Sequence, residues 1–270
     1  MTVSAGARRV PGRVHATRGR WLACIAATLL AMPGLAAPAP GKAAIASAHP
    51  LATAAGMEVL ARGGNAFDAA VAVSAALAVV EPNGSGMGGG GFYLLHRVAD
   101  GKQVVVDARE VAPAAAARDM YLDAARNPVE GLSTRHAKAA GIPGEPAGWE
   151  HLADEYGRLP LAASLAPAIR LAREGFVVTE RMHDDLARAL EDEGLGGDRR
   201  SEFARIYLVK GRAPPVGHRL RQPELARSLE VLAQGGADAF YRGPFARKLV
   251  AGVQALGGIW TGDDLAGYRV

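Results

Sequence analysis

EPNGSGMGGGGF, residues Glu81–Phe92, is the most unusual stretch of the sequence. Six of the eight residues from Gly84 to Gly91 are glycine, and a backbone without side chains can lie close against whatever it faces. The next residues predict a β-hairpin, with a strand at Phe92–Arg97, a tight turn, and a returning strand at Gln103–Ala108. The stretch therefore predicts a glycine-rich corner that leads into a hairpin, with Arg109 at the point where the hairpin ends.

The residues before the glycine loop predict two helices. Leu51–Arg62 is followed by a glycine pair, which commonly ends a helix just after its last turn. Asn65 is a good N-cap for Ala66–Val80, and Asp68 in the first turn suits the positive end of the helix dipole. The second helix is apolar on nearly every side, so we expect it to be buried.

The rest of the chain predicts a largely helical second half with no internal repeat and no clear domain break. Together with the hairpin, this order indicates the α+β class. The other expected elements are a short strand at Lys42–Ser47, loop and short helix over Ala112–Pro146, helices at Glu150–Tyr156 and Leu161–Glu174, a helix carrying Met182, Leu186 and Leu190, a polar loop at Gly194–Arg200, a strand at Arg205–Val209, and helices beginning at Pro223 and Pro244.

Residues 1–36 have the features of a secretory signal peptide. They contain five arginines and no acidic residue, then an apolar run, Trp21–Met32, and a small-x-small cleavage site at Gly34–Ala36. The apolar run is short for a helix that spans a bilayer. We expect a signal peptide at 1–36, a linker at 37–42 and a domain at 43–270, exported to the periplasm or secreted, with no stable membrane span after cleavage.

The basic character of the chain comes from this leader. The 270 residues contain 31 basic and 27 acidic side chains, a net charge of +4. Removing the five leader arginines leaves 26 basic residues against 27 acidic ones, so the net charge becomes −1. The sequence therefore gives no support to nucleic acid as a partner.

The glycine loop matches a nucleotide-binding pattern, but its neighbours are in the wrong order. Residues Gly84–Gly89 fit G-x-G-x-x-G, a pattern that binds dinucleotides when a strand precedes it and a helix follows. Here a helix precedes the loop and a strand follows, so no nucleotide cofactor is predicted. Ser85 lacks the strand-to-helix elbow of a hydrolase nucleophile for the same reason.

Metal and thiol chemistry are also not predicted. None of the seven histidines stands at metal-ligand spacing from another histidine or a cysteine. Five of them are expected at surface or capping positions: His49, His136, His151, His183 and His218. Cys24, the only cysteine, belongs to the leader, so the mature chain has no disulfide.

Arg109 follows an apolar strand and is close in sequence to the glycine-rich backbone. The planar guanidinium of an arginine there can bind one carboxylate through two hydrogen bonds. It can equally form an internal ion pair, for instance with Asp107 or Glu110. The residue pattern leaves both interpretations open.

Several longer motifs resemble the gamma-glutamyltranspeptidase family, in that family's order from Ala43 to the last residue. They are GGNAFDAAVA (63–72), EP followed by SGMGGGGF (85–92), DAREVAP (107–113) with RDMYLD (118–123), GIPGEPAGW (141–149) with EYG (155–157), and TGDDLAGY (261–268). Their number and length make a chance match a poor explanation.

The resemblance implies an N-terminal-nucleophile hydrolase with an αββα sandwich. In that family a precursor cuts itself into a large and a small subunit, and the threonine that starts the small subunit attacks the γ-glutamyl carbonyl. The acyl group then passes to water or to an amino acid or peptide acceptor. Glutathione is the usual donor, no cofactor or metal is required, and the arginine that maps onto Arg109 binds the α-carboxylate of the substrate.

One expected feature of the family has no match in the 270 residues. No threonine is followed by threonine and histidine, so we expect the nucleophile and the small subunit beyond Val270 and a sandwich that is incomplete in this chain. The chain alone is then expected to be inactive. Two alternatives stay open: a glutaryl or cephalosporin acylase of the same fold, and a non-catalytic remnant. Glutathione and glutaryl amide assays separate the first, and the coding sequence after codon 270 separates the second.

Overall fold

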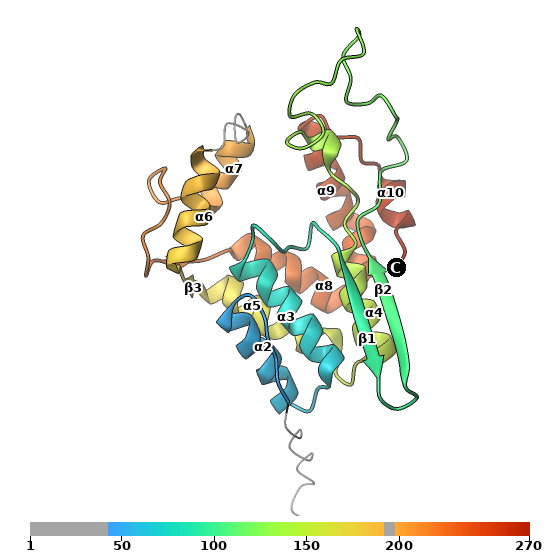
Figure 1. Cartoon of the computed structure of the whole chain (residues 1–270), viewed down its shortest axis with the longest axis vertical. Helices are drawn as coiled ribbons and strands as arrows, with labels where there is room; N and C mark the ends of the chain where they lie inside the picture. The colour runs from blue at the N-terminus through green and yellow to red at the C-terminus, as the bar shows by residue number, and fades with distance from the viewer. Residues whose placement is uncertain (1–42, 192–197) are drawn as a thin grey trace, which may run out of the picture. The chain divides into compact units, whose positions relative to one another are not determined.

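A computed structural model of the chain describes residues 43–191 and 198–270 (Figure 1). The helices are α2 (Pro50–Ala61), α3 (Ala66–Val80), α4 (Glu145–Tyr156), α5 (Leu161–Glu174), α6 (Glu180–Glu191), α7 (Asp198–Tyr207), α8 (Pro223–Tyr241), α9 (Gly243–Ala255) and α10 (Gly262–Gly267), with a 3-10 turn η1 (Ala137–Ala139). The strands are β1 (Gly91–Arg97), β2 (Lys102–Ala108), β3 (Phe176–Val177) and β4 (Arg219–Leu220). This mixture of helix and sheet confirms the α+β class.

Helix α3 lies at the centre of the helical core, as its uniformly apolar sequence predicts. It packs against α2 and α5, and α5 in turn packs against α8 (Figure 1). The approach of α2 and α3 is close, because a Cβ on Gly56 would lie 2.7 Å from Cγ2 of Val73. Asn65 and Asp68 form a reciprocal capping box at the start of α3.

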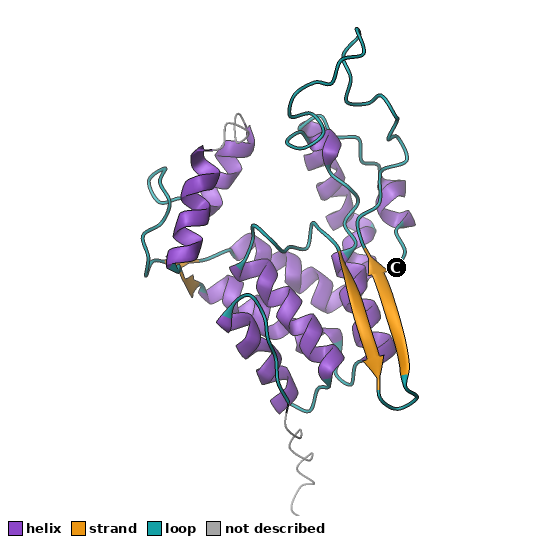
Figure 2. Cartoon of the chain, in the orientation of Figure 1, coloured by secondary structure: helices purple, strands orange, loops and turns teal. Residues whose placement is uncertain are grey.

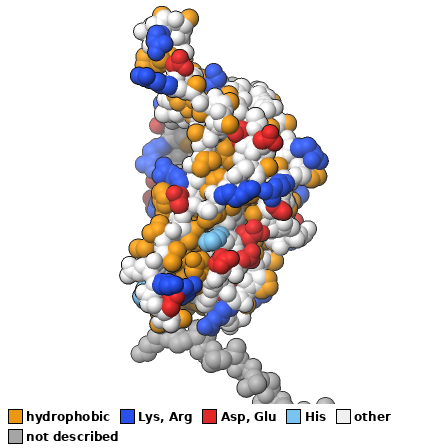
Figure 3. All heavy atoms as spheres, turned by 90° about the vertical axis from the view of Figure 1, so that its right-hand side faces the viewer, with side chains coloured by type: hydrophobic (Ala, Val, Ile, Leu, Met, Phe, Trp, Pro, Cys, Tyr) orange, Lys and Arg blue, Asp and Glu red, His pale blue; other side chains and the backbone are white. Residues whose placement is uncertain are grey.

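Strands β1 and β2 pair antiparallel and place one face of the hairpin on the helices (Figure 2). The inner face carries Leu95, Val106 and Ala108, all buried, and β2 contacts α4. The outer face carries Leu94 opposite Val105, and these side chains are 75% and 64% exposed. Figure 3, which views the side of the chain where the hairpin lies, shows hydrophobic side chains at the surface between charged ones. The hairpin therefore has an uncovered apolar face.

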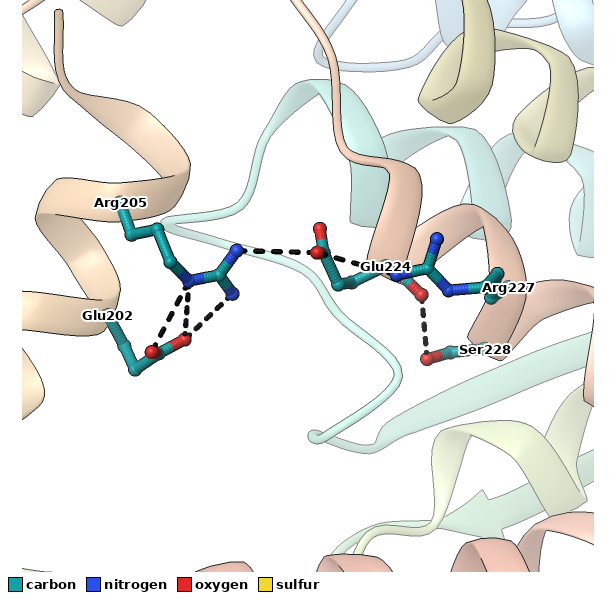
Figure 4. Close-up of polar contacts among 5 residues, drawn as sticks. All are labelled: Glu202, Arg205, Glu224, Arg227 and Ser228. Atoms are coloured by element: carbon teal, nitrogen blue, oxygen red, sulfur yellow. Dashed lines mark hydrogen bonds and ion pairs between the residues drawn. The ribbon is translucent and has the colours of Figure 1, made fainter.

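Helices α6 and α7 are connected to the core by polar contacts. Asn83, in the glycine loop, donates to Asp185 of α6 at 3.1 Å. Arg205 of α7 pairs with Glu202 one turn earlier and reaches Glu224 in the first turn of α8 at 3.3 Å. Figure 4 shows Arg205 between these two carboxylates, with Arg227 also directed toward Glu224. The two helices are thus joined to the glycine loop and to α8 by contacts at the surface.

Three sequence-based expectations are wrong. Residues 43–47 form no strand, since no partner strand lies beside them among the described residues. Arg205–Val209 is not a strand either, because α7 continues to Tyr207, and the tilted rings of Phe203 and Tyr207 pack one turn apart with 5.5 Å between their centres. Residues 198–200 of the expected polar loop belong to α7. The apolar residues of this region fit both the 3.6-residue period of a helix and the two-residue period of a strand, and tertiary packing selects the helix.

Other element boundaries differ from the prediction in smaller ways. Helix α4 begins at Glu145 instead of Glu150, and α8 runs through a kink at Gly236, whose φ is 64°, to Tyr241. Helix α10 was not predicted. The segment 112–144 contains only the short η1 turn, as expected from its alanines and prolines.

The expected signal peptide at 1–36 and linker at 37–42 lie outside the described residues, as do residues 194–197 of the expected polar loop. Within the part of the chain that the structure describes, no helix combines the length and apolar character that a membrane crossing requires.

Candidate functional site

Arg109 comes directly after the last residue of β2, and its side chain lies on the outer side of the hairpin. Its guanidinium carbon is 5.8 Å from the ring centre of Phe92, a distance at which a cation interacts favourably with an aromatic face. Its Nε lies 3.4 Å from Oε2 of Glu110, the one carboxylate within ion-pair distance among the described residues. The side chain is 65% exposed, so solvent and a ligand can reach it.

Two hydrogen bonds hold the backbone of Arg109. Its amide donates to Oδ1 of Asp107 at 3.0 Å, and its carbonyl accepts from the hydroxyl of Tyr268 at 2.8 Å. The expected internal pairing is therefore present in part: Glu110 contacts the guanidinium, whereas Asp107 contacts the amide. The guanidinium is paired on one side but remains exposed, so the ion pair with Glu110 leaves the carboxylate-binding interpretation of Arg109 as a prediction.

The glycine loop packs against the backbone on either side of Arg109. A Cβ on Gly90 would overlap the carbonyl of Ala108 and lie 2.8 Å from the amide of Glu110. The carbonyl of Gly89 accepts from the amides of Gly144 and Glu145, at 2.9 and 3.0 Å. The loop is thus a close backbone junction between α3 and β1, and the order of helix, loop and strand contradicts a dinucleotide site.

A buried carboxylate lies on the other side of this junction. Glu145 is 7% exposed, and its Oε1 accepts from the hydroxyl of Tyr93 at 2.6 Å, from Nε1 of Trp149 at 2.8 Å, and from the hydroxyl of Ser74. Burial, together with the nearby Glu145, raises the pKa of Tyr93 well above its usual range, so its hydroxyl stays a donor. Glu145 therefore connects α3, β1 and α4 beneath Arg109.

Sequence reasoning missed Glu145 and Tyr268. Glu145 stands between glycine and proline in a segment that resembled surface loop, and no local pattern marks it as buried. Tyr268 is separated from Arg109 by 159 residues, so its contact depends on the fold. The motif that ends in Tyr268 was a signal of family resemblance only.

The histidines occupy mostly structural positions. His49 and His136 accept backbone N–H groups at the starts of α2 and η1, which confirms their capping assignment. His183 Nδ1 lies 2.8 Å from the carbonyl oxygen of Pro214. The described residues include no group of three or more histidine, cysteine, aspartate or glutamate side chains placed to hold a metal ion.

Comparison with known proteins assigns the family. The family model described as gamma-glutamyltranspeptidase matches residues 52–270. The chain belongs to the gamma-glutamyltranspeptidase family. This segment contains the glycine loop, Arg109 and Tyr268, so the described junction lies within the matched region.

Individual relatives agree with this assignment. The chain is 42% identical over 225 residues to the glutathione hydrolase proenzyme of Escherichia coli (strain K12), which covers 83% of this chain and 38% of the relative. It is 40% identical over 247 residues to the acylase ACY 1 proenzyme of Pseudomonas sp. (strain SE83), and this match covers 86% of this chain and 42% of the relative. The gamma-glutamyltranspeptidase structure from Helicobacter pylori superimposes with a TM-score of 0.79 at 37% identity, over 85% of this chain and 66% of that one. The chain thus spans well under half of the two curated proenzymes.

Proposed function

We propose that this chain is part of an exported enzyme that transfers the γ-glutamyl group of glutathione and related donors to water or to an amino acid or peptide. Arg109 binds the α-carboxylate of the donor. The observation that carries the proposal is the position of Arg109: an exposed guanidinium at a strand end, on a rigid backbone junction, in a chain whose family acts on γ-glutamyl substrates.

The geometry suits recognition of a carboxylate. Phe92 lies against the guanidinium and Glu110 is on its Nε side, so the terminal nitrogens are the donors left for a ligand. Two parallel N–H donors match the two oxygens of a carboxylate. The hydrogen bonds with Asp107 and Tyr268 restrict the backbone of Arg109 and so keep its guanidinium aligned with the carboxylate of a substrate.

The remaining catalytic groups belong to sequence outside the 270 residues in this proposal. A small subunit from the same precursor supplies the threonine nucleophile and the second sheet of the αββα sandwich. The outer face of the hairpin supports this arrangement, because Leu94 and Val105 are mostly exposed and an isolated two-stranded sheet is only marginally stable. Arg109 projects from that same side, so the partner would complete the substrate site as it covers the sheet.

The test uses the protein encoded by the complete reading frame that contains this chain. Arg109→Lys keeps the charge but removes the planar pair of donors. We expect a loss of about 2 kcal/mol of transition-state stabilisation, roughly a 30-fold lower kcat/KM for γ-glutamyl-p-nitroanilide. The control is Arg97→Lys. Arg97 lies next to the turn of the hairpin, where it pairs with Asp100, and this change should alter kcat/KM by less than about twofold. An unchanged kcat/KM in Arg109→Lys would contradict the assignment.

A second candidate, a glutaryl or cephalosporin acylase, is favoured by the likeness to ACY 1 and by a solved cephalosporin acylase from Bacillus halodurans at 32% identity and a TM-score of 0.72, covering 85% of this chain. The terminal carboxylate of a glutaryl group can use the same arginine. Turnover of a glutaryl amide above that of glutathione would select this candidate.

The third candidate, a non-catalytic remnant, is tested in the coding sequence. An in-frame threonine-threonine-histidine stretch after codon 270 supports an enzyme, and a stop codon supports the remnant.

A further inference from the structure

Helix α10 and the residue after it lie against the segment Arg109–Ala114. Thr261 and Asp264 form a capping box that begins the helix. Tyr268 follows directly and is 6% exposed. A six-residue helix has little stability of its own, so its place depends on these contacts with the segment and with its neighbours.

The two elements are joined by hydrogen bonds at both ends of the segment. The hydroxyl of Tyr268 donates to the carbonyl of Arg109 at 2.8 Å, and the amide of Ala114 donates to Oδ1 of Asp264 at 2.8 Å. The hairpin ladder stops at Ala108, opposite Gly91. Arg109 is therefore the first residue beyond the ladder, and Tyr268 holds its carbonyl where strand pairing no longer does.

The hydroxyl of Tyr268 has a defined position. Its ring stacks on Tyr241 with 5.4 Å between centres and 8° between planes. Tyr241 in turn donates to the carbonyl of Pro143 at 2.8 Å. A Cβ on Gly144 would overlap both the hydroxyl of Tyr268 and the carbonyl of Ala108, so the Tyr268 hydroxyl lies in close contact with the residue that precedes α4.

The hydroxyl also stays protonated near neutral pH. Burial raises the pKa of Tyr268 to about 12, and the negative charges of Asp107, Glu110 and Glu145 act in the same direction. It therefore remains a hydrogen-bond donor to Arg109.

We propose that Tyr268 is a positioning residue for Arg109. Tyr268 fixes the guanidinium of Arg109 for the substrate carboxylate without itself touching the substrate. This inference rests on the proposed function. If it holds, losing the hydroxyl loosens the backbone under Arg109 and weakens discrimination for the carboxylate. The chemical step, which other groups perform, keeps its rate. A residue that only stabilised the fold would leave that discrimination intact.

The experiment compares Tyr268→Phe with Tyr241→Phe in the protein from the complete reading frame. Each change removes one buried hydroxyl from the same stacked pair, but only the first hydroxyl bonds to Arg109. The donors are γ-glutamyl-p-nitroanilide and 4-aminobutyryl-p-nitroanilide, which differ by the α-carboxylate. Wild type should prefer the first strongly in kcat/KM.

In Tyr268→Phe we expect the ratio of the two kcat/KM values to fall roughly five- to tenfold, because one hydrogen bond is lost. The fall should come from a higher KM for γ-glutamyl-p-nitroanilide, with kcat changed by less than about twofold. Tyr241→Phe should keep the preference. A preference in Tyr268→Phe within about twofold of wild type would overturn the inference, as would an equal loss in Tyr241→Phe. A wild-type protein without any preference would overturn the role of Arg109 itself.

A second measurement uses the protein from the complete reading frame and does not depend on turnover. Amide hydrogen exchange over residues 109–114 should be faster in Tyr268→Phe than in wild type and unchanged in Tyr241→Phe. Equal exchange in all three proteins would overturn the inference.

Discussion

Asp68 offers the sharpest test of how the helical core is held together. Its carboxylate is completely buried and accepts three backbone N–H groups. The amide of Asn65 donates to Oδ2 at 2.7 Å. The amide of Arg158 reaches both oxygens, at 3.2 and 3.0 Å, and that of Leu159 reaches Oδ1 at 3.2 Å. One side chain therefore caps α3 and also holds the connection between α4 and α5.

The change Asp68→Asn keeps the shape and replaces one acceptor oxygen by an NH2 donor. Whichever oxygen is replaced, either Asn65 or Leu159 loses its acceptor, because each of them bonds to a different oxygen. Losing one hydrogen bond to a charged group costs roughly 1.5–3 kcal/mol. Removing the negative charge from the first turn of a helix costs roughly another 0.3–1 kcal/mol. We expect Asp68→Asn to lower the free energy of unfolding by about 2–4 kcal/mol.

The assay is urea unfolding of the 270-residue chain, followed by circular dichroism. The control is Asp123→Asn, because Asp123 also accepts a backbone amide, that of Asn127 at 2.8 Å, but is exposed. It should change stability by less than about 0.5 kcal/mol. If Asp68→Asn lost no more stability than this control, the buried carboxylate would not hold the connection between α4 and α5.

Three further outcomes follow from single contacts. Gly144→Ala should destabilise the chain by roughly 1–3 kcal/mol, because its Cβ would overlap the Ala108 carbonyl; a thermal melt like that of wild type would refute this packing. Burial lowers the pKa of His49 in the folded protein below 6.5. The free energy of unfolding is therefore fully maintained above pH 6.5 and decreases as the pH falls through the pKa of His49 in the folded protein. The urea midpoint should therefore fall more between pH 7.5 and pH 5 in wild type than in His49→Asn, which keeps an N-cap that does not titrate. Equal falls in the two proteins would contradict this role of His49. Arg205→Ala should cost less than about 1 kcal/mol, because its partners Glu202 and Glu224 are exposed, and the cost should vanish near 1 M salt; a cost that persists there would indicate a packing role.

Regular elements were predictable where one periodicity ran long enough. Helices α3 and α5 match their predicted ranges, because an N-cap or proline begins each run and glycine or proline follows it. Residues 205–209 were not predictable, because a short apolar run fits both helix and strand. The strand expected before α2 failed for a related reason: a strand exists only where a partner strand pairs with it.

The candidate site divides in the same way. The motifs around Arg109 and the glycine loop were sufficient to indicate the family, and the family model matches residues 52–270. The role of Arg109 stays a prediction. Its supports, Glu145 beneath the junction and Tyr268 behind the carbonyl, could not be inferred from local pattern, since each contact joins residues far apart in the chain.

Local composition was enough to establish the α+β class, the glycine corner, the buried helix and the arginine at the strand end. These follow from backbone freedom and hydrophobic periodicity, which act over a few residues. The tertiary structure alone reveals that the glycine loop is a junction of three backbones and that Arg109 is held from behind by a tyrosine 159 residues away. The reason is physical: hydrogen bonds and steric overlap between distant segments depend on where the folded core brings them, and no local pattern records that.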